Sequence, residues 1–581
     1  MQKTAVSLLL FLIVLACGIT TAFAQQTEEQ TRQNLLPEID PQDIEIRSQF
    51  QARFPGLRRQ PILGFNPTPR VYQIDPERTP FIETEEAIAA SVPVGQLNRP
   101  DAPDYTPLSY SNPTNGFARL GIGSFVSPEA DVYAIKGFGN RNWVSGNLSH
   151  RSSNGHLDDL DSSFRELDAT VRSRLRMGSR SSLKLNAGTF SDFNYLPADE
   201  TDFVPANTAG GKSSVYGIRG GGEFTFNRTS VTGFHTTFDL FGHNFEMSET
   251  SGETLPGEAS EWGATARAGY TWAGPRTEEL FTAYADVDAG AIDLIGQPSE
   301  SRSIIEAGAS YKRLLNYQTD INASIGIAQV SDALSSSTIY IVPEVDARHT
   351  IFDGLDLRVR AAGTPEHLSF KEFREINSFT GLTDPVTHQY TSELRGEVIA
   401  EPLSGTMFTA GTSFRHVRNH AYFTRSEQES EISPGEFSTT RFAYSPNFEN
   451  ANFLKLYASF SQQLSAEKFW VSADAFWQRP RLSGNEKIPY TESFGVNGTV
   501  SFRPIRDLVL EGWADYSASR FNPTGENLDP YFLLGARFEL SLAGNAGIYA
   551  KLLNINDVNY EIWQGYSERG FQAFVGITYL F

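Results

Sequence analysis

The sequence predicts an all-β fold, a transmembrane antiparallel up-and-down β-barrel preceded by an extended N-terminal arm. Two observations predict it. Polarity alternates with period two from Gly116 to Phe581, and no convincing helical stretch interrupts the alternation. The alternating segments run for roughly ten to fifteen residues, whereas strands of soluble proteins cluster near 5–6 residues. Segments of this length match the roughly 9–11 residues with which a tilted strand crosses hydrocarbon.

The two faces of these segments predict what each face meets. In residues 164–177, Leu167, Val171 and Leu175 alternate with charged residues, and the charged face carries too many ions for a protein core. One face therefore meets lipid and the other a water-filled lumen. The sheet must close, because lipid cannot hydrogen-bond an open edge. Counting segments predicts about 22 strands, within a range of roughly 16 to 22, in a bacterial outer membrane.

Charged side chains on the alternating segments are the candidate lumen-lining residues. The arginines among them permit two interpretations. A row of lumen arginines can set the selectivity of a pore for anions, whereas ion pairing across strands, the simpler interpretation, only keeps the lumen face hydrated. Both interpretations stay open. The candidates are Glu166, Asp168, Arg172, Arg174, Arg176, Asp286, Asp288, Asp356, Arg358 and Arg360.

Aromatic residues near the proposed strand ends predict interfacial belts. A run of three glycines, Gly220–Gly222, predicts a bend or bulge in a strand, since the run lacks the Lys-Ser/Thr pair of a phosphate-binding loop. The belt candidates are Phe281, Tyr317, Trp470, Trp477, Trp513 and Tyr579.

The N-terminal residues 1–24 are expected to be a signal peptide, with a basic start, an apolar core and small residues at Ala22 and Ala24. A lipoprotein signal with lipidation at Cys17 is the rival interpretation. Both export the chain. Cys17 is the only cysteine, so cleavage after Ala24 leaves no disulfide, thiol metal site or cysteine nucleophile.

Residues 25–115 predict a Pro-rich extended arm ahead of the barrel of residues 116–581, because frequent prolines block helix interiors and central strands. The arm is expected either to occlude the lumen or to dock a periplasmic partner protein. The net charge of −21 argues against nucleic acid as a partner. No cofactor or metal is expected; the histidines and acids within residues 150–161 fit a polar hairpin loop better than a divalent-ion or lipopolysaccharide-bridging loop.

The last residues carry the most specific motif. "LNINDVNYEIWQGYSERGFQAFVGITYLF" resembles the final two strands of TonB-dependent outer-membrane receptors, with Asn554, Asp557 and Tyr560 in the turn, then a glycine and a terminal aromatic. The resemblance implies a signal read by the barrel-assembly machinery, carried by Gly576, Tyr579 and Phe581. The arm lacks a recognisable TonB box, and "LSHRSSNG" is similar to a segment of plugless, Bacteroidetes-like barrels of this type.

Three classes of function remain. The first is a transporter or channel for an unidentified solute, TonB-dependent-receptor-like without the usual plug. The second is an outer-membrane scaffold that binds a periplasmic or surface protein through the arm. The third, a membrane-embedded hydrolase, is not expected: the chain has no G-x-S-x-G frame, and only Ser152 and His150 are candidates for its chemistry.

Overall fold

The computed structural model describes residues 115–581, except for residues 139–141, 158–161, 197–211, 230, 249–257, 277, 295–297, 334–336, 382–385, 427–442, 466–467 and 543–544. The predictions for the signal peptide, for Cys17 and for residues 25–114 of the arm therefore lie outside the described residues.

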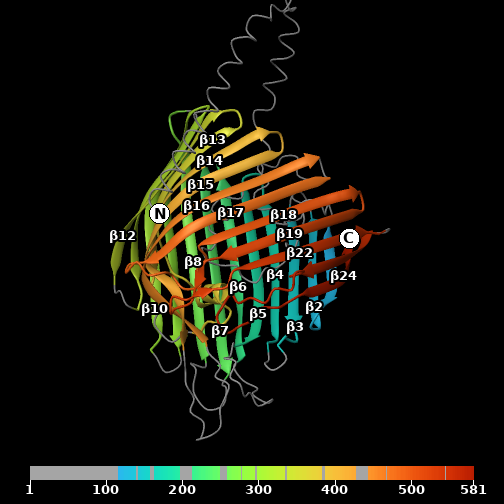
Figure 1. The fold of residues 1–581 in the computed structure, drawn as a ribbon. Helices are drawn as coiled ribbons and strands as arrows, with labels where there is room; N and C mark the ends of the chain where they lie inside the picture. Colours follow the sequence, from blue (N-terminus) through green and yellow to red (C-terminus); the bar gives the residue numbers. More distant parts are fainter. Residues whose placement is uncertain are drawn as a thin grey trace, which may run out of the picture. The chain divides into compact units, whose positions relative to one another are not determined.

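The described residues form one antiparallel sheet of 22 strands, a two-stranded hairpin and one short helix (Figure 1). The hairpin pairs β20 (Arg520–Phe521) with β21 (Asn527–Leu528), and the helix is α5 (Phe370–Ile376). The strands of the large sheet are β1 (Gly116–Gly123), β2 (Ser127–Phe138), β3 (Asn142–Ser153), β4 (Phe164–Met177), β5 (Ser181–Tyr195), β6 (Lys212–Asn227), β7 (Gly233–Ser248), β8 (Glu258–Ala273), β9 (Glu279–Leu294), β10 (Glu300–Asn316), β11 (Thr319–Ser331), β12 (Thr338–Phe352), β13 (Leu355–Glu366), β14 (Gln389–Leu403), β15 (Thr406–Ser426), β16 (Ala443–Ser465), β17 (Phe469–Leu482), β18 (Phe494–Ile505), β19 (Leu508–Ala518), β22 (Tyr531–Ser541), β23 (Ala546–Leu553) and β24 (Gln572–Leu580).

The sheet closes between its first and last strands. β1 pairs antiparallel with β24, from Phe117 opposite Leu580 to Gly123 opposite Phe574. In Figure 1 the last strands, in red, lie beside the first ones, in blue. Closure removes the edge that a lipid environment would leave unsatisfied. The predicted all-β barrel and its strand number are confirmed.

Outward-facing side chains form an apolar surface. On β11, Ile325 and Ile327 are each 61% exposed, whereas Ala328 and Val330 on the inner face are fully buried. Ile218 and Ile577 follow the same period-two pattern, and more than half of the surface of each side chain is exposed. A closed barrel with an apolar exterior is the structure that crosses an outer membrane.

The predicted aromatic belt is correct in part. On the outer face Trp272 stacks on Phe281, and Phe281 contacts Tyr311 at a tilt, so that a row of rings crosses β8, β9 and β10 with centroids 5.9 and 5.0 Å apart. The prediction is wrong for Trp513, which is 8% exposed and packs inside the barrel, because it shares a strand face with the inward residues Glu511 and Ser517.

The two ends of the barrel differ in their connections. At one end, short turns join the strands, such as residues 353–354 and 404–405, where Gly354 and Gly405 adopt positive φ. Gly116 and Phe581 also lie at this end and exchange backbone hydrogen bonds. The opposite end, called here the mouth, carries the long connections. Outer-membrane barrels turn their short connections to the periplasm, which places the mouth at the cell exterior.

Of the bend or bulge predicted at Gly220–Gly222, the bulge is wrong. β6 pairs through all three glycines with β5 and β7 without a register shift. A Cβ on Gly221 would come within 2.0 Å of the Asp239 carboxylate, and one on Gly222 within 2.7 Å of the Phe238 ring. Gly221 and Gly222 thus make room for side chains of β7, whereas a Cβ on Gly220 would meet only the Asn186 carbonyl, at 3.6 Å.

The helix α5 interrupts the β pattern between β13 and β14, and the sequence pattern did not predict it. Ser369 caps it: the Ser369 hydroxyl accepts from the Glu372 amide, and the Glu372 carboxylate accepts from the Ser369 amide. Phe370 and Phe373 lie three residues apart on its buried face. Among the described residues, no helix is both long and apolar enough to cross a membrane.

Candidate functional site

A segment between β13 and β14 folds onto the barrel wall at the mouth. We call it the lid and define it as residues 367–381 together with 386–388, with α5 at its centre. Its apolar side chains join the largest buried cluster of the described residues, together with side chains from β7, β9, β15, β16, β22 and the β23–β24 connection. The lid is therefore packed against several parts of the wall.

The N-terminal half of the lid is anchored to Glu261 of β8. One oxygen of this carboxylate accepts from the Phe370 amide at 2.7 Å, and the other binds the Arg302 guanidinium of β10. Arg302 also donates to the carbonyl of Leu368 at 3.0 Å, and His243 of β7 lies 2.7 Å from Glu261. The Glu261 and Arg302 side chains are almost fully buried, so their charges depend on each other.

The C-terminal half of α5 is held through Arg374. Its guanidinium donates to the Ser213 hydroxyl of β6 and, at 2.6 Å, to the Asn194 side-chain oxygen of β5. The guanidinium also lies 5.8 Å from the ring of Phe245 on β7. All of these groups are buried. A planar guanidinium suits this position because it forms several hydrogen bonds and stacks on an aromatic ring.

The two ends of the lid carry histidines that face carboxylates. Asp332, just after β11, accepts from the Thr387 hydroxyl at 3.0 Å and the His388 amide at 2.9 Å, and it contacts His388 Nδ1 at 2.5 Å. Burial raises the pKa of Asp332, but these hydrogen bonds outweigh it and hold the pKa below its usual value. At the other end, His367 Nδ1 lies 3.7 Å from the Asp288 carboxylate of β9.

Aromatic side chains link the lid to both sides of the mouth. Phe370 packs on Phe245 of β7, with ring centroids 4.6 Å apart, and Phe373 packs on Phe423 of β15 at 6.2 Å. Phe379 lies 4.7 Å from Tyr566 of the β23–β24 connection. We call these contacts the aromatic bridge. Each aromatic pair adds roughly 0.5–1.5 kcal/mol beyond its buried area.

The β23–β24 connection, residues 554–571, supplies the opposite half of the bridge. Its Trp563 ring lies 4.7 Å from Tyr490 and 5.2 Å from Tyr444. Tyr566 lies 5.9 Å from His156, which lies 6.0 Å from Phe125 in the β1–β2 turn. Contacts between rings thus run from the β1–β2 turn, through the lid, to β7 and β15, and these two strands are not neighbours in the sheet.

The receptor-like turn motif builds the base of this connection. Asn554 and Asp557 both adopt positive φ. The Asn554 side chain exchanges hydrogen bonds with the backbone of Val558, and the Asp557 carboxylate accepts from the Phe571 amide at 2.7 Å. Asn and Asp tolerate this backbone region better than other residues with side chains.

Several predicted lumen residues form ion pairs along the wall. Asp168 pairs with Arg219 at 2.6 Å, and Asp286 with Arg267 at 4.0 Å. Three further pairs lie on β12 and β13: Asp356 with Arg348 at 2.7 Å, Arg358 with Asp346 at 2.5 Å, and Arg360 with Glu344 at 2.9 Å. Asp288 instead faces the lid through His367.

The arginine row of β4 differs from these pairs. Within the described part of the chain, no ion pair or side-chain hydrogen bond engages Arg172 or Arg174. The Arg176 amide donates to Asn142 at 2.6 Å, and its guanidinium reaches only the Ser179 carbonyl, at 3.5 Å. Glu166, at the mouth end of β4, lines the wall pocket described below. The anion-selective role of the row stays a prediction.

The candidates for hydrolytic chemistry lie close together: Ser152 Oγ is 3.2 Å from His150 Nε2 on β3. Ser152 and its neighbour Arg151 both line the wall pocket described below, whereas Leu148, two residues before His150, is 41% exposed. No hydrogen bond joins His150 to an acid among the residues described. No metal-binding cluster of three or more His, Cys, Asp or Glu occurs there either, and Asp158, Asp159 and Asp161 lie outside the description.

The predicted assembly residues lie on or next to β24, at the barrel seam, which is the pairing of β24 with β1. Tyr579 and Phe581 face outward, 49% and 44% exposed, with their rings stacked 6.2 Å apart. A Cβ on Gly576 would come within 2.3 Å of the Leu120 carbonyl and 2.5 Å of the Tyr549 ring. Gly576 therefore lets Tyr549 cross the seam. Recognition by the assembly machinery stays a prediction.

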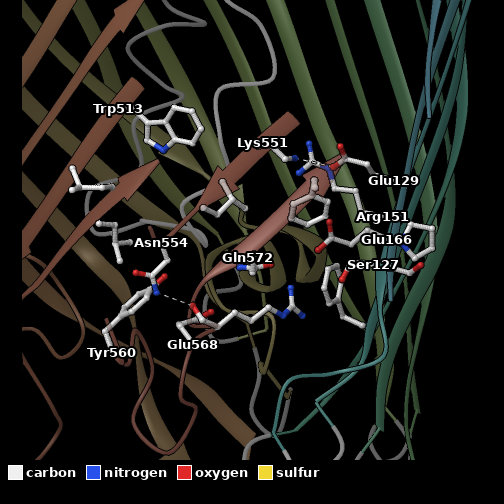
Figure 2. A pocket seen from close by; sticks show the side chains of 18 residues that line it. Ser127, Glu129, Arg151, Glu166, Trp513, Lys551, Asn554, Tyr560, Glu568 and Gln572 are labelled. Atoms are coloured by element: carbon white, nitrogen blue, oxygen red, sulfur yellow. Dashed lines mark hydrogen bonds and ion pairs between the residues drawn. The ribbon is translucent and has the colours of Figure 1, made fainter. Parts of the chain in front are cut away.

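A wall pocket lies beside the seam, and the connection of residues 554–571 contributes part of its lining (Figure 2). Glu129, Arg151 and Glu166 line one side; Trp513 and Tyr560 line the other. Sequence reasoning missed this pocket, because its two sides come from opposite ends of the chain.

No protein-family model matches the chain, and no curated protein matches it. Solved structures do. The ferric-catecholate import receptor Fiu of E. coli K12 is 10% identical, with a TM-score of 0.59 and 81% of this chain and 82% of that chain covered. The ferric yersiniabactin uptake receptor FyuA of Yersinia pestis is 12% identical, with a TM-score of 0.61 and 81% of each chain covered. The copper transporter OprC is 12% identical, with a TM-score of 0.60 and 80% of each chain covered.

The fold and the comparisons define a class of protein, an outer-membrane β-barrel. More particularly, the 22-stranded barrel has the architecture of the TonB-dependent receptors that the C-terminal motif resembles. At this level of identity the similarity shows the fold, and the prediction that the usual plug is lacking concerns residues outside the described part of the chain.

Proposed function

We propose that the protein is an outer-membrane transporter or channel whose lumen is gated at the mouth by the lid. The aromatic bridge is the observation that carries the proposal, because it ties the lid to strands on different sides of the barrel. The charged inner wall gives a water-filled path, and the apolar exterior fits lipid. The names of the similar structures, an import receptor, an uptake receptor and a copper transporter, support the transport class.

Passage of a solute then requires the lid to leave the bridge. The lid is a connection between two strands, so it can move without breaking the pairing of β13 with β14. Its polar anchors, Glu261 and Arg374, bind it to the wall at separate points. In this proposal the packed lid is the closed state, and release of these anchors and of the bridge opens the path.

The test is the conductance of the purified full chain in planar bilayers. Phe379→Ala removes the ring that joins the lid to Tyr566, and it should raise the frequency of openings about tenfold, as the loss of about 1.4 kcal/mol predicts. Ile327→Ala, on the lipid-facing side of β11, is the matched control and should leave conductance unchanged. Absence of ion or solute passage in the wild type and in Phe379→Ala alike would contradict the proposal and favour the scaffold function.

A further inference from the structure

The wall pocket has a cavity volume of about 80 Å³. At roughly 10–15 Å³ for each water molecule, this space holds about six waters, or a ligand the size of a monosaccharide. Figure 2 shows Glu129, Arg151 and Glu166 across the pocket from Trp513 and Asn554, with Gln572 between them. The pocket faces the lumen side of the seam strands.

The charged groups of the pocket are already engaged. The Glu129 carboxylate accepts from Lys551 at 2.8 Å and from Tyr549 at 2.6 Å. The Arg569 guanidinium lies 4.2 Å from the Phe164 ring. Arg151, Glu166 and Glu568 have interactions of their own as well. The three acids and three bases of the lining leave no net charge for a ligand to neutralise.

The groups left over are uncharged. Trp513 is 8% exposed, yet its indole N–H has no hydrogen-bond partner among the described residues, and the same holds for the Gln572 amide. In Figure 2 the indole nitrogen is turned toward the interior of the pocket. A buried tryptophan usually finds a partner for its N–H, so this donor is available to a ligand.

We propose that the wall pocket binds an uncharged, hydroxyl-bearing solute of monosaccharide size. The Trp513 indole donates to a ligand hydroxyl, Gln572 both donates and accepts, and the aromatic rings of the lining cover an apolar ligand face. A charged solute is disfavoured, because it would enter a partly buried site without a free counter-charge.

This inference rests on the proposed function and assigns the pocket to the same transport path. The connection that roofs the pocket with Tyr560 also supplies Trp563 and Tyr566 to the aromatic bridge. A bound solute therefore contacts the element that holds the lid.

The test is equilibrium binding to the full chain in detergent, measured by calorimetry with glucose, galactose and N-acetylglucosamine as neutral probes. Gluconate and glucosamine are charged counterparts of similar size. We expect at least one neutral probe to bind about tenfold more tightly than the charged probes. Trp513→Phe, which removes the N–H and keeps an aromatic ring, and Gln572→Met, which removes the amide, should each weaken binding about tenfold.

Two further variants separate the pocket from general effects. In Gly535→Ala a Cβ would come within 2.1 Å of the Trp513 indole, so the ring must shift and binding should fall. Trp477→Phe, on the lipid-facing side and 44% exposed, should bind as the wild type does. Retention of the heat-modifiable gel mobility shows that each variant is folded.

Absence of saturable binding for every neutral probe, equal binding of neutral and charged probes, or wild-type binding by Trp513→Phe and Gln572→Met would each overturn the inference and leave the pocket a hydrated feature of the wall. Binding and conductance are measured separately. A protein that conducts without binding the probes contradicts this inference alone, and one that binds them without conducting contradicts the proposed function.

Discussion

The Tyr549 hydroxyl of β23 donates a 2.6 Å hydrogen bond to the Glu129 carboxylate of β2, across the seam where the first and last strands meet. To reach it, the ring crosses β24 and β1, where it lies over Gly576 and Gly121. Lys551 binds the second oxygen of Glu129 at 2.8 Å. The contact joins four consecutive strands, and it depends on glycine at the two positions in between.

Tyr549→Phe should destabilise the closed barrel by about 2 kcal/mol, because it removes a buried hydrogen bond to a charged acceptor. Gly576→Val should cost more, because its Cβ overlaps the Tyr549 ring and the Leu120 carbonyl. Urea unfolding in micelles measures both. Val575→Ala, on the lipid-facing side of the same strand, is the control. A Gly576→Val barrel as stable as this control would contradict a stabilising role for the Tyr549–Glu129 contact.

Glu261→Gln tests the anchor of the lid. The variant keeps an acceptor for the Phe370 amide but leaves the Arg302 guanidinium buried without its counter-charge, which costs about 3–5 kcal/mol. Amide hydrogen exchange in residues 370–376 should therefore speed up by a factor of 100 or more, up to the limit set by local opening. Glu306→Gln is the control. It changes the carboxylate that accepts a hydrogen bond from Tyr284 elsewhere on the wall, and it should leave amide exchange in the lid unchanged.

The Asp332 carboxylate predicts how the lid responds to acid. Because its pKa lies below the usual value, it contributes stability above the ordinary carboxyl pKa of about 4, and this contribution is lost as the pH falls through the depressed pKa. Asp332→Asn should thus lower the unfolding midpoint near pH 7, and the difference from the wild type should shrink below about pH 4. A difference that stays constant down to pH 3 would show that Asp332 does not act through its charge.

The arginine row of β4 should influence which ions pass. Arg172→Ala combined with Arg174→Ala removes two lumen cations without an acidic partner among the described residues, so the anion-to-cation permeability ratio should fall. Reversal potentials in a salt gradient measure it, in the Phe379→Ala background where openings are frequent. Lys136→Ala, on the outer face of β2, is the control. An unchanged permeability ratio would contradict a role of the arginine row in ion selectivity, and the row would then serve only to keep the wall hydrated.

The sequence was sufficient for the barrel but not for its mouth. Alternation such as that of Ile325 and Ile327 is local, so lipid-facing and lumen-facing positions follow from it directly. The lid depends on contacts between distant segments, for example Phe379 with Tyr566. Its helix of seven residues is too short for a helical period to stand out.

Other features depend on which strand lies next to which. The sequence predicts Trp513 as a belt residue because it lies near a proposed strand end, and only the sheet register places it beside Phe574 and Leu553. The run Gly220–Gly222 predicts a bend or bulge because the side chains that fill the space over Gly221 and Gly222, Asp239 and Phe238, lie on the following strand. One resemblance did extend to structure: Asn554 and Asp557 form the turn that their receptor-like spacing indicates.

The central claim is that the lid closes the lumen through the aromatic bridge, and cross-linking tests it most directly. Phe379→Cys combined with Tyr566→Cys places two thiols where the rings now lie 4.7 Å apart, in a chain whose only native cysteine is Cys17. Single-channel conductance is then recorded before and after treatment with a short bismaleimide. The account predicts frequent openings before cross-linking and silence afterwards, and equal conductance in the two states would contradict it.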